Sequence, residues 1–142
     1  MAKKNFLERG ARGADLCGMK NDIRGREDIQ LLIDSFYVQV RKDELIGYIF
    51  EDVAKVDWVH HLPVMYDFWE QILFHTGGYS GNPMALHVRL NEMIPLKKEH
   101  FDRWLALFTG TVNEHFEGPI AEMARQRALS IATTIRVKIA AA

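Results

Sequence analysis

Apolar residues recur at the period of an α-helix in four long segments of this chain. In residues 26–41, six side chains three and four positions apart form one stripe: Ile29, Leu32, Ile33, Phe36, Tyr37 and Val40. The same period runs within residues 56–74, 96–116 and 119–139. No segment alternates apolar and polar residues as a half-buried strand would, and no hairpin signal is present. The sequence therefore predicts an all-α fold built from these helices and some shorter ones.

Composition limits the classes of protein to which the chain can belong. Its 142 residues, 48% hydrophobic and 26% charged, suit one globular domain. No apolar run is long enough for a transmembrane helix. A net charge of −1 and a pI of about 6.6 give no general attraction for nucleic acid or anionic membranes. The single cysteine, Cys17, excludes an internal disulfide and cysteine-based metal clusters. Because the N-terminus lacks a secretory h-region, we expect a cytoplasmic protein that binds neither membranes nor nucleic acid.

A change in composition suggests one domain boundary. Residues 1–25 carry four glycines, scattered basic residues and no sustained apolar period. We expect them to form an N-terminal extension that is either flexible or folded only by docking on the domain. Residues 26–142 would then form the globular domain.

Prolines and glycines set the expected helix ends. Pro63 disfavours the α conformation at the residue before it, so we expect the regular helix within 56–74 to begin near Pro63, with His61 at its mouth. Asn82-Pro83 follows a glycine-rich loop and predicts a helix start, with an N-cap followed by proline at the first helical position. Pro95 should end this short helix.

Four side chains that carry a polar atom lie at helix positions from which they could line a binding site. Tyr37, His61 and Trp104 fall on the apolar stripes of their helices, and His87 lies in the short helix after the glycine loop. Taken singly, each is more simply explained as core packing, although a buried phenol or indole still needs a hydrogen-bond partner. Together they suggest a polar-dotted cavity between helices, where bundle cofactors bind. No Glu-x-x-His pair, HExxH, P-loop or GxGxxG sequence is present.

The remaining histidines carry no such pattern. His60, His75, His100 and His115 are interpreted as ordinary structural or surface residues, and His100 and His115 lie off the apolar stripe of their helix. No serine lies in a nucleophile-elbow motif. A nucleophilic triad is therefore not indicated.

Several short strings, in their order and spacing, resemble the group III truncated haemoglobins, which are short globins with a two-on-two helical sandwich around haem b. The resemblance runs from about Asp28 to Ile139. The strings are Phe36-Tyr37, Val40-Arg41-Lys42-Asp43, Leu45-Ile46-Gly47, Ile49-Phe50, Trp58-Val59-His60-His61, Phe68-Trp69, Tyr79-Ser80-Gly81-Asn82-Pro83 before His87, Glu99-His100-Phe101-Asp102-Arg103-Trp104-Leu105 and Gln126-Arg127-Ala128.

The resemblance implies a role for each site residue. His87 matches the proximal histidine, the protein ligand to haem iron. Tyr37, His61 and Trp104 match the residues on the distal side, where a gas ligand binds. Further cofactor-binding positions are implied for the packing residues Phe50, Met65, Phe68 and Trp69.

The residue chemistry agrees with these roles. Haem iron needs a neutral imidazole on one side and an open position on the other. The Tyr37 hydroxyl and the Trp104 indole can donate hydrogen bonds to bound O₂, which carries negative charge. Two such bonds, each worth about 1.5–3 kcal/mol, would slow O₂ release by roughly two orders of magnitude or more. Arg89 could meet a haem propionate, although a solvated surface charge is the simpler interpretation.

The expected function is therefore binding of O₂ and other diatomic ligands, with redox chemistry on O₂, NO or peroxide favoured over bulk oxygen transport. NO dioxygenase or peroxidase-like turnover would need a separate reductase as electron donor, and we expect a monomer. His61 could be a gate or donor beside the ligand, or a sixth ligand to iron, and His60 is a second candidate for either task. The alternatives are a gas or redox sensor, or a helical interaction module without turnover.

Overall fold

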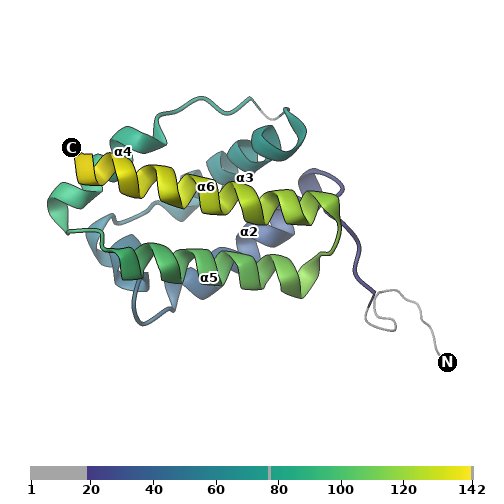
Figure 1. The fold of residues 1–142 in the computed structure, drawn as a ribbon, viewed down its shortest axis with the longest axis horizontal. Helices are drawn as coiled ribbons and strands as arrows, with labels where there is room; N and C mark the ends of the chain where they lie inside the picture. The colour runs from purple at the N-terminus through teal and green to yellow at the C-terminus, as the bar shows by residue number, and fades with distance from the viewer. Residues whose placement is uncertain (1–18, 77, 142) are drawn as a thin grey trace.

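In the computed structural model, which describes residues 19–76 and 78–141, helices form every regular element. They are α2 (Arg26–Arg41), the π-helical turn η4 (Ile49–Val53), α3 (Trp58–Phe74), α4 (Pro83–Met93), α5 (Lys98–His115) and α6 (Pro119–Ala141). Helices α5 and α6 run side by side as an antiparallel pair, with α2 and α3 behind them, while α4 lies along the C-terminal part of α6 (Figure 1). The predicted all-α, two-on-two architecture is confirmed.

The core lies where the stripe of α2 meets α5 and the first half of α6. The six predicted stripe residues of α2 are all buried. Phe108 and Val112 of α5 are also fully buried. Helix α6 presents small residues at the same interface, namely Ala121, Ala124 and Ala128, which let the helices approach closely. No helix within the described ranges is both long and apolar enough to cross a membrane.

Helix α3 begins five residues before Pro63, so the predicted start near that proline is wrong. The Asp57 carbonyl accepts hydrogen bonds from the backbone N–H groups of His60 and His61, at 3.1 and 2.8 Å, and these close the first turn. Pro63 costs the helix only the bond to the Val59 carbonyl. Because Pro63 and Val59 are both exposed, water can satisfy that carbonyl. His61 therefore lies inside the helix, in its first turn and a half.

The described end of the predicted extension contacts the domain, while residues 1–18 lie outside the described residues. Ile23 is buried. The Asp22 carboxylate accepts hydrogen bonds from the backbone N–H groups of Ile120 and Ala121, at 2.9 and 2.8 Å. These N–H groups belong to the first turn of α6 and have no partner within the helix. Asp22 thus serves as a side-chain cap supplied from a distant part of the chain.

His100 is buried, contrary to the expectation that it lies off the apolar face of its helix. It sits in the first turn of α5, where its ring turns back along the chain. Its Nδ1 accepts a hydrogen bond from the backbone N–H of Lys97 at 2.9 Å. His100 thereby satisfies an N-terminal N–H group of the helix region, which is a structural role.

Candidate functional site

His87 is held in one orientation by its own helix. Asn82 and Pro83 start α4 as predicted, since the Asn82 side-chain oxygen accepts a hydrogen bond from the backbone N–H of Ala85 at 3.1 Å. One turn later, the Nδ1 of His87 lies 2.6 Å from the Pro83 carbonyl oxygen. A carbonyl can only accept, so Nδ1 is the donor in this bond. His87 is therefore an oriented imidazole whose other ring nitrogen, Nε2, is left free of the helix and could bind a metal.

The surfaces near α4 are apolar but incompletely covered. Helix α4 itself has no fully buried residue. Apolar side chains of α3, α4 and α5 pack against the core and yet stay half-buried, namely Leu62, Met65, Phe68, Ile72, Leu90, Trp104 and Leu105. These side chains come from the helices on which the predicted site residues Met65, His87 and Trp104 lie. They offer apolar surface that a large apolar group could cover.

Four aromatic rings surround Tyr37. Its ring centroid lies 4.8 Å from that of Phe36, 5.1 Å from that of Trp58, 5.5 Å from that of His61 and 6.0 Å from that of Phe50. Burial raises the pKa of Tyr37 well above its usual range. The phenol therefore keeps its proton and remains a hydrogen-bond donor at any physiological pH.

His61 is the polar group that the fold leaves unsatisfied. Its Nε2 is the one buried side-chain nitrogen or oxygen without a hydrogen-bond partner among the described residues. Burial lowers the pKa of His61, and the nearby imidazole of His87 lowers it further. His61 is thus neutral at pH 7 and lies within electrostatic range of His87. The structure brings together the two histidines that the sequence analysis singled out.

Trp104 belongs to a second aromatic group, beside the first. Its ring stacks on Phe108 at 5.7 Å and meets Phe36 edge-on at 5.6 Å, and Phe36 in turn lies 4.8 Å from Tyr37. In the part of the chain that the structure describes, Trp104 makes no ring contact with Tyr37 or His61. Of the three predicted distal residues, Tyr37 and His61 are therefore in direct ring contact. Trp104 is connected to them through the ring of Phe36.

The predicted packing residues differ in burial and in the rings that they contact. Phe50 and Met65 are half-buried against the core. Trp69 is buried and stacks on Phe108 at 4.7 Å, while Phe68 contacts both Trp69 and Tyr79, at 5.7 and 5.1 Å. Phe68 thus also supports the loop that leads into α4.

The other candidates point away from this region. The His60 Nδ1 lies 2.8 Å from an Asp57 carboxylate oxygen, and its side chain is exposed. Arg89 is also exposed. Trp58, by contrast, contacts both Tyr37 and His61, although its role was missed in the sequence. The signal for it was its position three residues before His61, which places both on one face of a helix.

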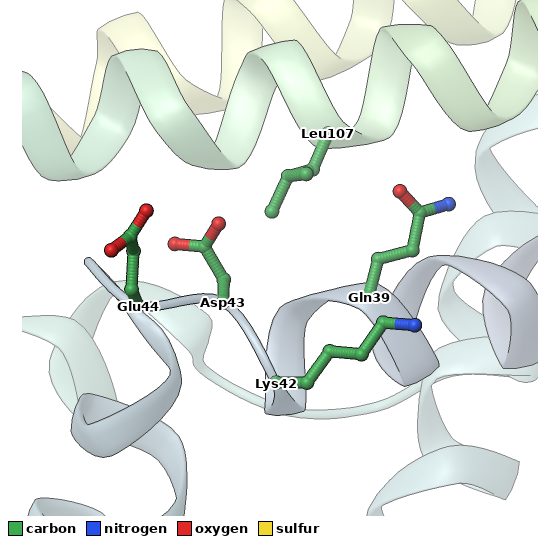
Figure 2. A pocket seen from close by; sticks show the side chains of 5 residues that line it. All are labelled: Gln39, Lys42, Asp43, Glu44 and Leu107. Atoms are coloured by element: carbon green, nitrogen blue, oxygen red, sulfur yellow. The ribbon is translucent and has the colours of Figure 1, made fainter.

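A separate hollow of about 370 Å³ lies at the C-terminal end of α2. Its lining comes from the end of α2, the following loop and α5, as Figure 2 shows: Gln39, Lys42, Asp43, Glu44 and Leu107. Asp43 pairs there with Arg103 at 2.8 Å. None of the predicted site residues lines this hollow, and its charges are of both signs.

Comparison with known proteins adds two relatives. No protein-family model matches the sequence. The chain is 31% identical over 118 residues to the group 3 truncated hemoglobin ctb of Campylobacter jejuni, covering 81% of this chain and 91% of that protein. The crystal structure of a group III truncated hemoglobin from Campylobacter jejuni superimposes with a TM-score of 0.74 at 31% identity, covering 85% of this chain and 95% of the other.

Proposed function

The chain belongs to the group III truncated haemoglobins, and from this membership and the geometry of the site we propose that it binds haem b through His87. Membership makes it a globin that binds ligands at haem. On the distal side, the proposal assigns Tyr37, His61 and Trp104 to the pocket for O₂ and other diatomic ligands. Phe50, Met65, Phe68 and Trp69 would pack around or beneath the haem.

The observation that carries the proposal is the state of the His87 ring. A haem-ligating imidazole must be neutral, must offer one nitrogen and must be held at the other. The bond from Nδ1 to the Pro83 carbonyl holds one ring nitrogen and leaves the other free to bind the iron. The half-buried apolar surface of α3, α4 and α5 supports the same assignment, because haem is a large and mostly apolar group.

On the distal side, the chain offers a donor and an unpartnered nitrogen. Haem, when bound, would supply the iron at which a diatomic ligand binds and the electron for redox chemistry. The buried phenol of Tyr37 keeps its proton and can donate a hydrogen bond, and the indole of Trp104 offers only a donor. Each bond to a negatively polarised ligand is worth about 1.5–3 kcal/mol, so each slows ligand release by roughly tenfold or more.

Slow release favours redox chemistry on O₂, NO or peroxide over bulk oxygen transport. His61 lies beside Tyr37, is neutral at pH 7 and has a free Nε2, so it can accept and return a proton in the pocket. Reductive turnover would need a separate reductase as electron donor. We propose a cytoplasmic monomer whose ligands are O₂ and other diatomic molecules.

The test is absorption spectroscopy of the purified protein: ferric, reduced with dithionite, and reduced with CO. The decisive variant is His87→Gly, measured with and without added imidazole, and His60→Gly is the matched control at an exposed histidine of a helix. We expect His87→Gly to lose the Soret band or its normal ferrous spectrum, and imidazole to restore it. Unchanged ferrous spectra in His87→Gly would show that His87 is not the axial ligand.

The same spectra address the alternative role of His61. A five-coordinate ferrous form that binds CO indicates an open distal position, as turnover requires. A six-coordinate ferrous form without added ligand, abolished by His61→Leu and kept in His60→Leu, would instead make His61 a sixth ligand and favour a sensor. Absence of a Soret band after reconstitution with haem would refute the haem proposal altogether.

A further inference from the structure

Trp58 joins the surface of the molecule to the two polar residues of the pocket. On its inner side, the Trp58 ring lies 5.1 Å from Tyr37 and 5.6 Å from His61, centroid to centroid. It also stacks on Phe50 at 6.2 Å. Trp58 is therefore in contact with three proposed pocket residues at once.

On its outer side, Trp58 is held by an ion pair. The indole Nε1 donates a hydrogen bond to a Glu51 carboxylate oxygen at 2.6 Å. The Arg41 guanidinium lies over the indole, 4.9 Å from its centroid. Arg41 Nε and Nη2 each lie 3.2 Å from one of the two carboxylate oxygens of Glu51. The hydrogen bond from Trp58, followed by that from Arg41, lowers the pKa of Glu51, which therefore stays ionised and keeps both partners.

These contacts come from three separate elements. Arg41 is the last residue of α2, Glu51 belongs to the wide turn of η4, and Trp58 is the first residue of α3. Lys55 adopts the left-handed conformation, at φ 52°, in the connection between η4 and α3. Glu51 and the Trp58 indole meet across this connection. We call Arg41, Glu51 and Trp58 the clamp.

The unsatisfied nitrogen of His61 explains why a clamp is needed. Inside the pocket, Nε2 has no hydrogen-bond partner, whereas in solvent it would be hydrated. His61 lies in the first turn and a half of α3, close to the surface of the molecule. Its ring packs edge-on against Tyr37 and Trp58, at interplanar angles of 78° and 84°. Those two rings therefore help to hold the side chain inside.

We propose that the clamp is a positioning device which, by fixing Trp58 from the surface, keeps His61 in the pocket beside Tyr37. The functional consequence rests on the haem-binding function proposed above. Loosening the clamp lets the His61 ring turn outward, which exposes its nitrogen and opens the distal side to ligands.

The experiment measures how fast each histidine is acylated by diethyl pyrocarbonate, located by tandem mass spectrometry, in the protein as purified. Exposed His60 and His75 serve as internal references for fast modification. In the native chain, His61 should react far more slowly than His60. In Glu51→Ala, the rate at His61 should rise about threefold or more, the size of effect expected when an exposed ion pair and its hydrogen bond are lost.

Two further variants separate the clamp from general loosening of the region. Glu51→Gln keeps an oxygen that can accept the indole N–H, and so it should restore most of the protection. Asp52→Ala changes the exposed neighbouring carboxylate of η4 and should leave the His61 rate unchanged. The proposal is overturned if Glu51→Ala leaves the His61 rate at the native value, if Asp52→Ala raises it equally, or if native His61 reacts as fast as His60.

A second readout uses the haem-loaded protein. After flash photolysis of its CO complex, CO should rebind about threefold faster in Glu51→Ala than in the native chain, with the Soret band unchanged. Unchanged rebinding would refute the effect on ligand entry. If no Soret band forms in the native chain, the haem proposal fails while the acylation rates still decide whether the clamp holds His61.

Discussion

Replacing His61 with leucine should stabilise the haem-free protein. On folding, the His61 Nε2 leaves water and gains no hydrogen bond. A buried polar group without a partner costs about 1–3 kcal/mol. Because the side chain as a whole is only half-buried, we take the lower part of that range, about 1–2 kcal/mol. Leucine has a similar volume and keeps the packing against Tyr37 and Trp58, so most of that cost should be recovered.

The assay is urea unfolding of the haem-free protein at pH 7.5, followed by far-ultraviolet circular dichroism. A gain of about 1 kcal/mol should raise the midpoint by roughly 0.5–1 M without changing the m-value. His60→Leu is the control, because His60 is exposed and bonded to Asp57. It should bring no gain in stability, since it removes no unsatisfied group.

The difference in unfolding free energy between His61→Leu and the native chain should widen as the pH falls. Burial and the nearby His87 hold the pKa of His61 below its usual value in the folded state. Between the two pKa values, the unfolded chain binds a proton at this position and the folded chain does not, so falling pH destabilises the native protein. That contribution begins as the pH passes below about 6.5, the usual value for histidine, and His61→Leu lacks it.

Two results would refute this reasoning. If His61→Leu is less stable than the native chain at pH 7.5, the Nε2 atom has a partner in solution and the cost was misjudged. If the difference between the two proteins is the same at pH 7.5 and pH 5.5, the pKa of His61 is not lowered by the fold. The haem-loaded forms should show the reverse ranking for O₂ retention, because leucine cannot hydrogen-bond to a ligand.

Two further predictions concern the distal donors and the cap of α6. Tyr37→Phe and Trp104→Phe should each speed O₂ release by roughly tenfold or more, measured by stopped-flow displacement with CO, and unchanged rates in both would remove the two-donor argument. Asp22→Ala should destabilise the protein by about 1–2 kcal/mol in urea unfolding, because two backbone N–H groups of α6 lose their acceptor. Asp22→Asn, which keeps an acceptor oxygen, should lose less.

The helices could be predicted from the sequence because their burial is one-sided. The stripe of residues 26–41 matches α2 at both ends, since each apolar position faces the same core. The predicted helix start at Pro63 was wrong because proline destabilises a helix mainly through the hydrogen bond that it removes. Here the carbonyl that lacks this bond is exposed, and water can bond to it instead. The capping role of Asp22 could not be predicted, because its partners at Ile120 and Ala121 lie far along the chain.

The sequence suggested residue types for the candidate site but not their geometry. His87, His61 and Tyr37 were found through resemblance and helical spacing. The partner of the His87 Nδ1 is a backbone carbonyl, which side-chain patterns do not reveal. The position of Trp58 depends on the path of the chain through η4, and local periodicity carries no information about that path. The placement of Phe36 between Trp104 and Tyr37 likewise depends on how α5 packs on α2.

The distribution of unsatisfied groups implies that stability and ligand binding oppose each other at this site. Where α2 meets α5, side chains such as Phe36 and Phe108 are fully packed. Toward α4, apolar residues stay half-buried and the His61 nitrogen has no partner. The half-buried apolar residues and the unpartnered nitrogen each lower the stability of the haem-free chain. A bound haem and its ligand would remove both costs. Substitutions that repair them without the cofactor should therefore weaken ligand retention, whereas substitutions in the α2–α5 core should lower stability with and without haem. We therefore expect a substitution that repairs His61 to raise the stability of the haem-free chain and to weaken ligand retention. A substitution at Phe108 should lower stability both with and without haem.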